Sequence, residues 1–199
     1  MGYTTNFTGE WKLNKPLTPE HKAYLQKFSN TRRVKRDPAL TAKRDDPIRA
    51  AVGLPVGVEG GYFVGAGGEF GQEGFGFVFG DSTVTKQATL GILDDNEPPE
   101  GQPGLWCKWE PNDDGTTIRW SGAEKFYEYT AWITYLLDHF LTPWGYILSG
   151  KVKWKGEDSS DKGYICISNN KVFVNQEPTA LDQIVEAVNA PPKAKKRRG

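Results

Sequence analysis

The sequence predicts an α+β protein with a ferredoxin-like (split β-α-β) antiparallel sheet that carries its helices on one face. Three observations favour this fold class. Short segments with a period of two indicate strands, two segments with helical spacing lie between them, and their order is strand, helix, insertion, strand, strand, helix, strand. A further hairpin and a last helix then extend this unit at the C-terminus.

The length and composition predict one folded domain. The chain has 199 residues, of which 37% are hydrophobic and 13% aromatic, which is too apolar for a disordered chain. We expect a single domain over residues 1–190 and a disordered basic tail over residues 191–199. The tail, PPKAKKRRG, has no apolar residue larger than alanine, so it cannot contribute to a core.

The sequence also predicts a compartment. No apolar run approaches the roughly 18 residues of a membrane span, and the first residues lack the basic leader of a signal peptide. We therefore expect a cytoplasmic protein without a membrane partner. Cys107 and Cys166 have no Cys-x-x-Cys spacing, so we interpret them as small buried hydrophobic residues rather than as a zinc site or a disulfide.

The first two elements follow from periodicity and capping. Residues Tyr3 to Leu13 alternate roughly and indicate a strand. Thr18-Pro19-Glu20 supplies an N-cap, a proline at the first helical position and an early acidic residue, which predicts a helix running to about Thr31. Residues 32–49 are basic and broken by proline, and we expect a loop or a short helical connector there.

The insertion, about residues 53–93, begins with a glycine-rich stretch. Residues 53–80 contain 11 of the 23 glycines of the chain. Glycine weakens regular structure while aromatic side chains favour burial, so we expect an irregular loop or hairpin lying over the core. The same stretch carries six large aromatic residues, namely Tyr62, Phe63, Phe70, Phe75, Phe77 and Phe79.

The central hairpin and helix have local signals. Leu105 to Glu110 alternates, a turn follows, and Thr116 to Trp120 returns as the partner strand. Ser121 and Glu124 match a capping box, which predicts a helix from Ser121 to about Thr142. Its apolar residues repeat at three and four positions: Phe126, Tyr129, Ile133, Leu136, Leu137 and Phe140.

The C-terminal third predicts three strands and a helix. The strands are expected at Trp144 to Lys155, Tyr164 to Ser168 and Lys171 to Asn175, with a turn at Asn169-Asn170. Thr179 caps the last helix, whose apolar residues have helical spacing.

Charge is segregated along the chain although the net charge is zero. Residues 1–50 carry 11 Lys/Arg against 5 Asp/Glu, and residues 51–150 carry 4 against 14. Basic segments at both ends are suited to phosphate contacts, and nearby Trp or Tyr could stack on bases. The candidate nucleic-acid-binding residues are Arg32, Arg33, Lys35, Arg36, Lys151, Lys153, Lys155, Lys193, Lys195, Lys196, Arg197 and Arg198. The aromatic-rich pattern of RNA-recognition domains is absent from the central strands.

Other chemistry has weaker signals. The glycine spacing fits neither a dinucleotide loop nor a P-loop, because Phe70 stands where the third glycine would be. Glu157, Asp158 and Asp161 could supply oxygen ligands to a divalent metal ion, although a polar hairpin turn also explains them. No nucleophile motif is present. We therefore assign no catalytic residue and no cofactor.

Several segments resemble a group of small proteins found in bacterial and bacteriophage genomes. They are the opening Gly2-Tyr3-Thr4-Thr5-Asn6-Phe7-Thr8-Gly9, the strand Gly104-Leu105-Trp106-Cys107, the segment Ile118 to Tyr127, and the segment Gly150 to Asp158. The similarity covers most of residues 2–175. It implies a prokaryotic or viral cytosolic setting and brings no activity with it.

Three functions are consistent with these observations. The leading hypothesis is a non-enzymatic binding or interaction protein, in a phage-associated setting, with a protein partner bound by the six aromatic residues of the insertion. The first alternative is a nucleic-acid-binding protein that uses the basic segments. The second alternative is a metal-dependent enzyme at Glu157, Asp158 and Asp161. The oligomeric state stays open.

Overall fold

The computed structural model describes residues 2–41, 47–54, 92–94 and 96–179. Within them, helices combine with a six-stranded antiparallel sheet and a second, two-stranded one, so the α+β prediction is confirmed. Most of the insertion, the expected C-terminal helix and the basic tail lie outside the described residues. No helix in the described ranges has the length and apolar character needed to cross a bilayer.

The first strand, β1 (Thr5–Leu13), forms where the period of two predicted it. Phe7 and Trp11 are buried, while their neighbours on the other face are exposed. Gly9 has a φ of 101°, and a Cβ there would lie 2.7 Å from the backbone oxygen of Lys151. Only glycine therefore allows this close approach between β1 and the strand beside it.

The first helix, α1 (Pro19–Ser29), begins as predicted. Thr18 has an extended backbone, and its Oγ1 accepts a hydrogen bond of 3.3 Å from the backbone N–H of His21. This bond satisfies one of the amide groups that a helix start leaves unpaired. The helix buries Tyr24, Leu25 and Phe28, which follow the helical spacing of the sequence.

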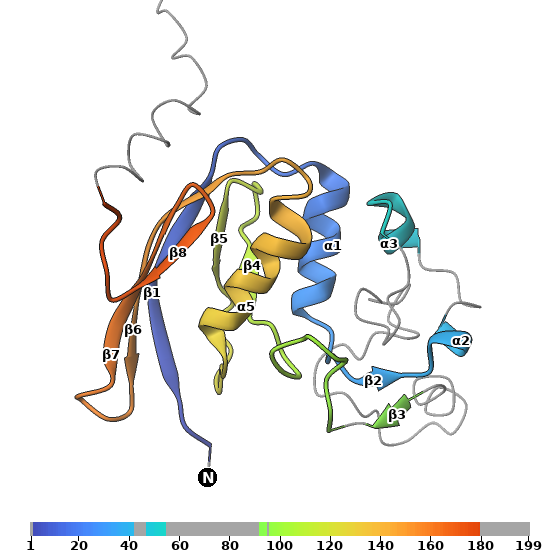
Figure 1. Ribbon diagram of the computed structural model, residues 1–199, viewed down its shortest axis with the longest axis horizontal. Coiled ribbons are helices and arrows are strands. Elements are labelled where there is room, and N and C mark those ends of the chain that lie inside the picture. Colours follow the sequence, from blue (N-terminus) through green and yellow to red (C-terminus); the bar gives the residue numbers. More distant parts are fainter. Residues whose placement is uncertain (1, 42–46, 55–91, 95, 180–199) are drawn as a thin grey trace, which may run out of the picture.

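Four short elements flank the insertion. They are β2 (Lys35–Arg36), α2 (Pro38–Thr41), α3 (Pro47–Ala51) and β3 (Ile92–Asp94). Strand β2 pairs with β3 in antiparallel register, so the residues before and after the insertion are joined. In Figure 1 these elements lie on the side of α1 that faces away from the large sheet.

The predicted hairpin is confirmed as β4 (Trp109–Pro111) and β5 (Thr117–Trp120). Its turn is held by Asn112, whose Oδ1 accepts the backbone N–H groups of Thr116 at 2.9 Å and Thr117 at 3.1 Å. The first strand is shorter than expected, because residues 105–108 do not pair in the sheet.

The predicted capping box at Ser121 is wrong. The helix α5 (Tyr129–Leu136) begins eight residues later, and Glu128 at its N-cap position has a φ of 52° and makes no side-chain cap. Gly122 and Lys125 also have positive φ values, 83° and 57°. These left-handed residues are incompatible with a helix, so residues 121–128 form an irregular segment instead.

The remainder of this helix agrees with its apolar spacing. Helix α5 continues into a π-helical turn, η1 (Leu137–Leu141), which ends just before Thr142 as predicted. Four residues of the expected apolar face, Ile133, Leu136, Leu137 and Phe140, are fully buried. The wider turn of a π-helix departs from the i→i+4 pattern at this helix end.

The last three strands are β6 (Leu148–Gly156), β7 (Lys162–Ser168) and β8 (Lys171–Val174). Strand β6 begins four residues after the predicted start at Trp144. The predicted turn between β7 and β8 is confirmed: Asn169 and Asn170 have φ values of 50° and 65°, which asparagine tolerates better than most residues.

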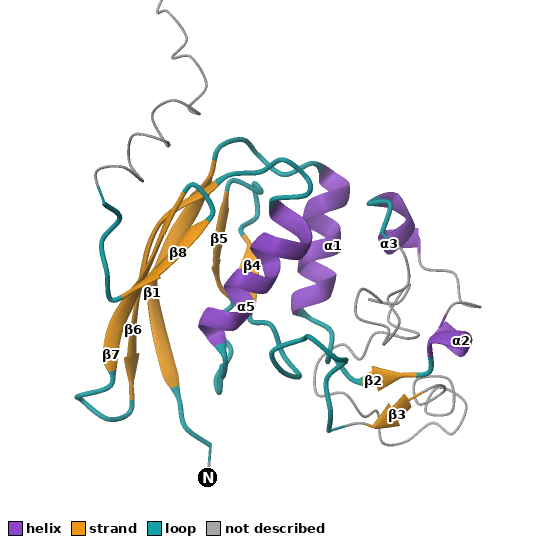
Figure 2. Ribbon diagram, viewed as in Figure 1, coloured by secondary structure: helices purple, strands orange, loops and turns teal. Residues whose placement is uncertain are grey.

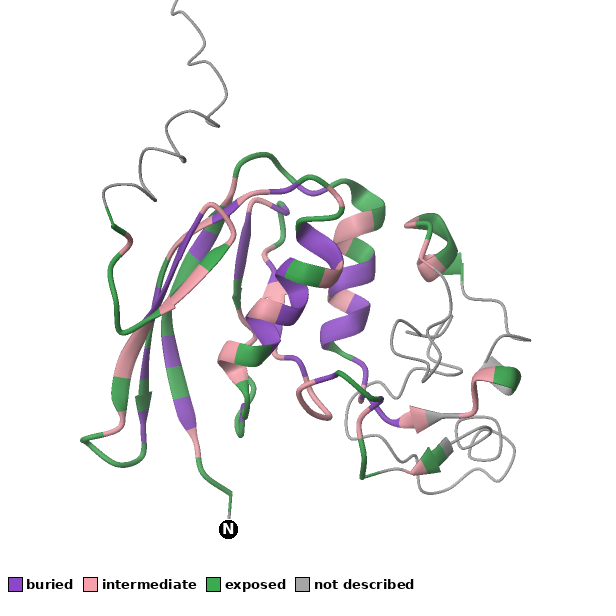
Figure 3. Cartoon of the chain, viewed as in Figure 1, coloured by how far each residue is buried: buried purple, intermediate pink, exposed green. Residues whose placement is uncertain are grey.

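The large sheet has the order β4-β5-β1-β6-β7-β8, and every neighbouring pair is antiparallel. Helices α1 and α5 lie side by side over one face of this sheet (Figures 1 and 2). Figure 3 shows buried and exposed positions alternating along the strands, and burial concentrated where the helices meet the sheet.

Aromatic rings fill the space between the two layers. Trp11 meets Trp109 at 4.7 Å between ring centroids, and Phe7 meets Trp109 at 5.0 Å, both edge to face. Such pairs add stability beyond their buried area. Trp132 and Phe140 extend the cluster from the helical layer, and both are fully buried.

Both cysteines are buried, as the sequence predicts, and no disulfide joins them within the described residues. Burial raises the pKa of the Cys107 thiol to about 12, and the thiolate is the reactive form. We expect Cys107, isolated in a Cys166→Ser variant, to react with a thiol-specific disulfide reagent only after the chain is unfolded. Rapid stoichiometric labelling in native buffer would contradict this burial.

Candidate functional site

One face of the large sheet carries no described helix, and we call it the open face. Residues directly opposite one another in a sheet share a face, so the strand register identifies its members. They are Asn6, Thr8, Glu10 and Lys12 of β1, Glu110 of β4, Thr117 and Arg119 of β5, Ser149, Lys151, Lys153 and Lys155 of β6, Lys162, Tyr164, Cys166 and Ser168 of β7, and Lys171 and Phe173 of β8.

The open face is strongly basic. It holds seven Lys or Arg residues against two Glu residues. Arg119 lies 3.8 Å from Glu110, and Lys151 pairs with Glu177, whereas Lys153 and Lys155 are exposed and have no ion-pair partner in the described part of the chain. Like charges on neighbouring strands repel, so this face favours an anionic partner.

The open face also has an aromatic element. Tyr164 lies opposite Lys153, and Phe173 lies opposite Cys166; both rings are half-buried. The ammonium of Lys151 lies 4.7 Å from the centroid of the Tyr164 ring, which is within the range of a cation–π contact. The rings belong to β7 and β8, not to the central strands where RNA-recognition domains place theirs.

The N-terminal basic residues that were also predicted to bind nucleic acid do not belong to the open face. Arg33 is buried, with its guanidinium 4.5 Å from the Phe28 ring and its Nε donating to Gln102 at 3.3 Å. Its role is therefore in packing. Arg32 donates to Asn96 at 3.3 Å. Lys35 and Arg36 form β2, away from the open face.

Two sets of predicted residues lie outside the described residues, and their roles stay predictions. One is the basic tail: Lys193, Lys195, Lys196, Arg197 and Arg198. The other is the partner-binding set of the insertion: Tyr62, Phe63, Phe70, Phe75, Phe77 and Phe79.

The acidic loop predicted as a metal site is engaged in hydrogen bonds. Asp161 accepts from the Tyr3 hydroxyl at 2.7 Å and from the Trp154 indole at 3.2 Å. Glu157 accepts from the Thr4 amide at 2.7 Å, and Asp158 accepts from Ser160. No group of three His, Cys, Asp or Glu residues among the described positions is arranged to hold a metal ion. The metal hypothesis stays a prediction.

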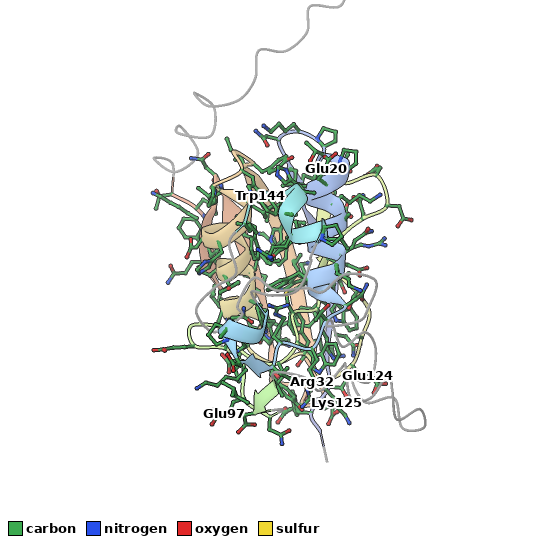
Figure 4. All side chains as sticks on the ribbon, turned by 90° about the vertical axis from the view of Figure 1, so that its right-hand side faces the viewer. Glu20, Arg32, Glu97, Glu124, Lys125 and Trp144 are labelled. Atoms are coloured by element: carbon green, nitrogen blue, oxygen red, sulfur yellow. The ribbon has the colours of Figure 1, made fainter. Side chains whose placement is uncertain are left out.

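A second concave site was not anticipated from the sequence. It is a groove of about 860 Å³, lined by the end of α1, residues 103–108 before β4, the irregular segment 121–128 and Trp132 of α5. We call it the groove. Figure 4 shows Arg32, Glu124 and Lys125 gathered at the same end of the molecule, and all three line the groove.

The polar chemistry of the groove centres on Lys108. This side chain is half-buried, and its Nζ donates to the backbone oxygen of Glu124. Burial lowers the pKa of Lys108, and the nearby Lys125 lowers it further, while Glu124 acts in the opposite direction. The charged form of Lys108 is therefore less favourable than that of an exposed lysine, and a nearby anion would stabilise it.

Besides the open face and the groove, a polar cluster lies at the N-terminus of α1. His21 stacks on Trp144 at 4.0 Å between centroids, and its Nδ1 lies 2.9 Å from the Tyr146 hydroxyl. That hydroxyl also accepts the Thr18 amide at 3.1 Å, so it joins the His21 ring to the start of the helix.

This arrangement predicts a pH dependence of stability. Burial lowers the pKa of His21; the neighbouring Glu20 acts in the opposite direction, and Lys15 lowers the pKa further. A lowered folded pKa means that the unfolded chain binds more protons. The His21 contribution is therefore fully present above the ordinary value of 6.5 and is lost as the pH falls through the folded pKa.

The measurement is the free energy of unfolding in urea from pH 8 to pH 5, for the native chain and His21→Gln. We expect the free energy of unfolding to fall less steeply with decreasing pH in His21→Gln than in the native chain. His139→Gln is the control, because burial also lowers the pKa of His139. This variant should keep the part of the pH dependence that comes from His21. Identical pH profiles for the native chain and His21→Gln would contradict the argument.

The chain was compared with protein families, curated proteins and solved structures, and no match was found in any of the three.

Proposed function

We propose that this protein is a non-enzymatic binding protein that holds a single-stranded nucleic acid across the open face. The observation that carries the proposal is the row Lys151, Lys153 and Lys155 on β6, flanked by Tyr164 and Phe173 on the next two strands. Lysines supply contacts to phosphates, and aromatic rings supply stacking surfaces that tolerate any base.

The spacing of the row supports a strand-like partner. Residues two apart on a strand are separated by about 6.6 Å, so successive lysines of β6 present their charges at regular intervals along one line. Lys12 of β1 and Lys162 of β7 add charges on both sides of that line. A flexible single strand can follow such a surface, whereas a rigid duplex offers its bases no access to the two rings.

The fold supports the same proposal. We infer a ferredoxin-like core in β6-β1-β5-β4, because a split β-α-β unit places its last strand beside its first and the central hairpin on the other side. Folds of this kind leave the sheet face opposite the helices available to RNA. Here β7 and β8 widen that face beyond β6.

Fluorescence anisotropy with end-labelled single-stranded RNA and DNA tests the proposal. The native chain is compared with a chain that ends at Pro192, which lacks the basic tail. We expect both to bind, with an affinity that falls steeply as salt increases, because the open face is intact in both. Absence of binding, or its complete loss on removing the tail, would overturn the assignment to the open face.

A further inference from the structure

The groove lies apart from the open face and has a different character. Apart from the two carboxylates of Glu124 and Glu128, most of its polar side chains are donors: Arg32, Lys108, Lys125 and the indoles of Trp106 and Trp132. Arginine, lysine and tryptophan side chains donate hydrogen bonds and accept none. We propose that the groove binds a small planar molecule that carries an anionic group, of the class of the nucleoside monophosphates.

Three cationic side chains of the groove favour an anionic group on the ligand. Arg32, Lys108 and Lys125 come from three separate segments and line the same groove. Lys108 and Arg32 are half-buried, whereas Lys125 is exposed. Within the described residues the Lys108 ammonium donates only to the Glu124 backbone oxygen. A lysine ammonium has three protons to donate, so Lys108 retains donors for an anion.

Two tryptophans of the groove, Trp106 and Trp132, favour a planar ligand that accepts hydrogen bonds. Four of the seven indoles donate to protein acceptors, those of Trp11, Trp109, Trp120 and Trp154. Trp106 and Trp132 have no acceptor among the described residues, and Trp132 is fully buried. Neither indole nitrogen is among the buried side-chain polar atoms that lack a partner in the described part of the chain, so both N–H groups reach the solvent of the groove, where a ligand oxygen or ring nitrogen would accept from them in place of water.

One wall of the groove is conformationally strained. Lys125 and Glu128 have φ values of 57° and 52°, in a region that costs a residue other than glycine stability. Buried Phe126, which packs 5.1 Å from Trp109 between centroids, anchors the segment between them. Strained residues tend to concentrate at ligand sites, where the surrounding structure holds them in place.

The size of the groove is suited to this ligand class. Its volume of about 860 Å³ is within the range of small-molecule sites and exceeds what an inorganic anion alone would fill. Leu105 and Pro103 add apolar surface beside the two indoles, which favours a ligand with an unsaturated ring. This inference does not depend on the open face binding a nucleic acid.

The test uses the indole N–H signals of the ¹⁵N-labelled full chain in two-dimensional NMR. Titration with adenosine 5′-monophosphate is expected to move the signals of Trp106 and Trp132 in a saturable way and to leave that of Trp11 in place. The open face has no tryptophan among its members, so binding there leaves these signals unchanged. Absence of any saturable shift up to about 10 mM ligand would overturn the proposal.

Variants and competing ligands locate the binding groups. Lys108→Gln is expected to weaken the monophosphate at least about tenfold, and Lys12→Gln, on the open face, is the matched control that should bind normally. Adenosine without phosphate should bind more weakly, as should inorganic phosphate. Equal binding of adenosine and its monophosphate would contradict the proposed role of the anionic group, and unchanged affinity in Lys108→Gln would contradict the assigned site.

A second measurement covers the possibility that Lys108→Gln disturbs the fold. Trp106→Phe keeps a ring and removes one donor, and it is expected to reduce affinity while the remaining indole signals keep their positions in the free protein. The variant Lys153→Glu/Lys155→Glu should retain monophosphate binding. Loss of that binding would place the ligand on the open face and overturn the groove assignment.

Discussion

Replacement of both Lys153 and Lys155 by glutamate is expected to weaken binding of single-stranded RNA or DNA by about 30-fold or more at low salt. Both side chains are exposed on the open face and have no ion-pair partner among the described residues. Loss of two phosphate contacts also reduces the slope of log affinity against log salt by about 1.4. Anisotropy titrations at several salt concentrations measure both effects.

The control for charge alone is Lys15→Glu/Lys22→Glu. Lys22 belongs to α1, which covers the opposite face of the sheet (Figure 1), and Lys15 precedes that helix, with its Nζ 4.9 Å from the centroid of the Tyr146 ring. The variant has the same net charge. It should stay within about threefold of the native affinity, because remote charges are screened. If the two variants weakened binding equally, the effect would come from overall charge and not from the open face.

The second large effect concerns the close contact of β1 with β6. Gly9→Ala is expected to destabilise the chain by roughly 3 kcal/mol, since a positive φ costs alanine about 1–2 kcal/mol and the clash with the Lys151 backbone oxygen adds a similar amount. For a chain of this size the melting temperature should fall by about 10 °C. Thermal unfolding followed by circular dichroism measures it.

Gly101→Ala separates the two causes. Gly101 has a φ of 82°, and a Cβ added there would meet nothing within 4 Å. It should therefore show only the conformational cost, about 1–2 kcal/mol. If both variants lost the same stability, the backbone contact between Gly9 and Lys151 would have no energetic consequence.

The elements that the sequence predicts well are those whose signals are local. The Thr18 cap and Pro19 fix the start of α1, and the asparagine pair between β7 and β8 suits the turn they form. The alternation of Phe7 and Trp11 with exposed neighbours identifies β1. In each case the residues that carry the signal also make the interaction, so no tertiary information is needed.

The start of α5 shows where local signals fail. Ser121 and Glu124 have the correct spacing for a capping box, yet the Glu124 backbone oxygen accepts from Lys108 and the Ala123 oxygen accepts from the Trp120 indole. Phe126 is then buried in the core. These tertiary contacts hold residues 121–128 out of a helix, and no pattern within the segment indicates them.

The two sites differ in the same way. The lysines at 151, 153 and 155 were identified from their alternation, but only the register of β7 and β8 places Tyr164 and Phe173 on the same face. The groove combines segments that are distant in the sequence, from Ser29 to Trp132. Neither its tryptophan donors nor its cations share a spacing that a sequence motif could express.

The most direct test of the central claim is photochemical cross-linking of the full chain to a single-stranded RNA containing 4-thiouridine, followed by mass spectrometry. The proposed function predicts cross-links at Tyr164 and Phe173 of the open face. Cross-links found only in the insertion, the tail or the groove, with none on β6, β7 or β8, would contradict it.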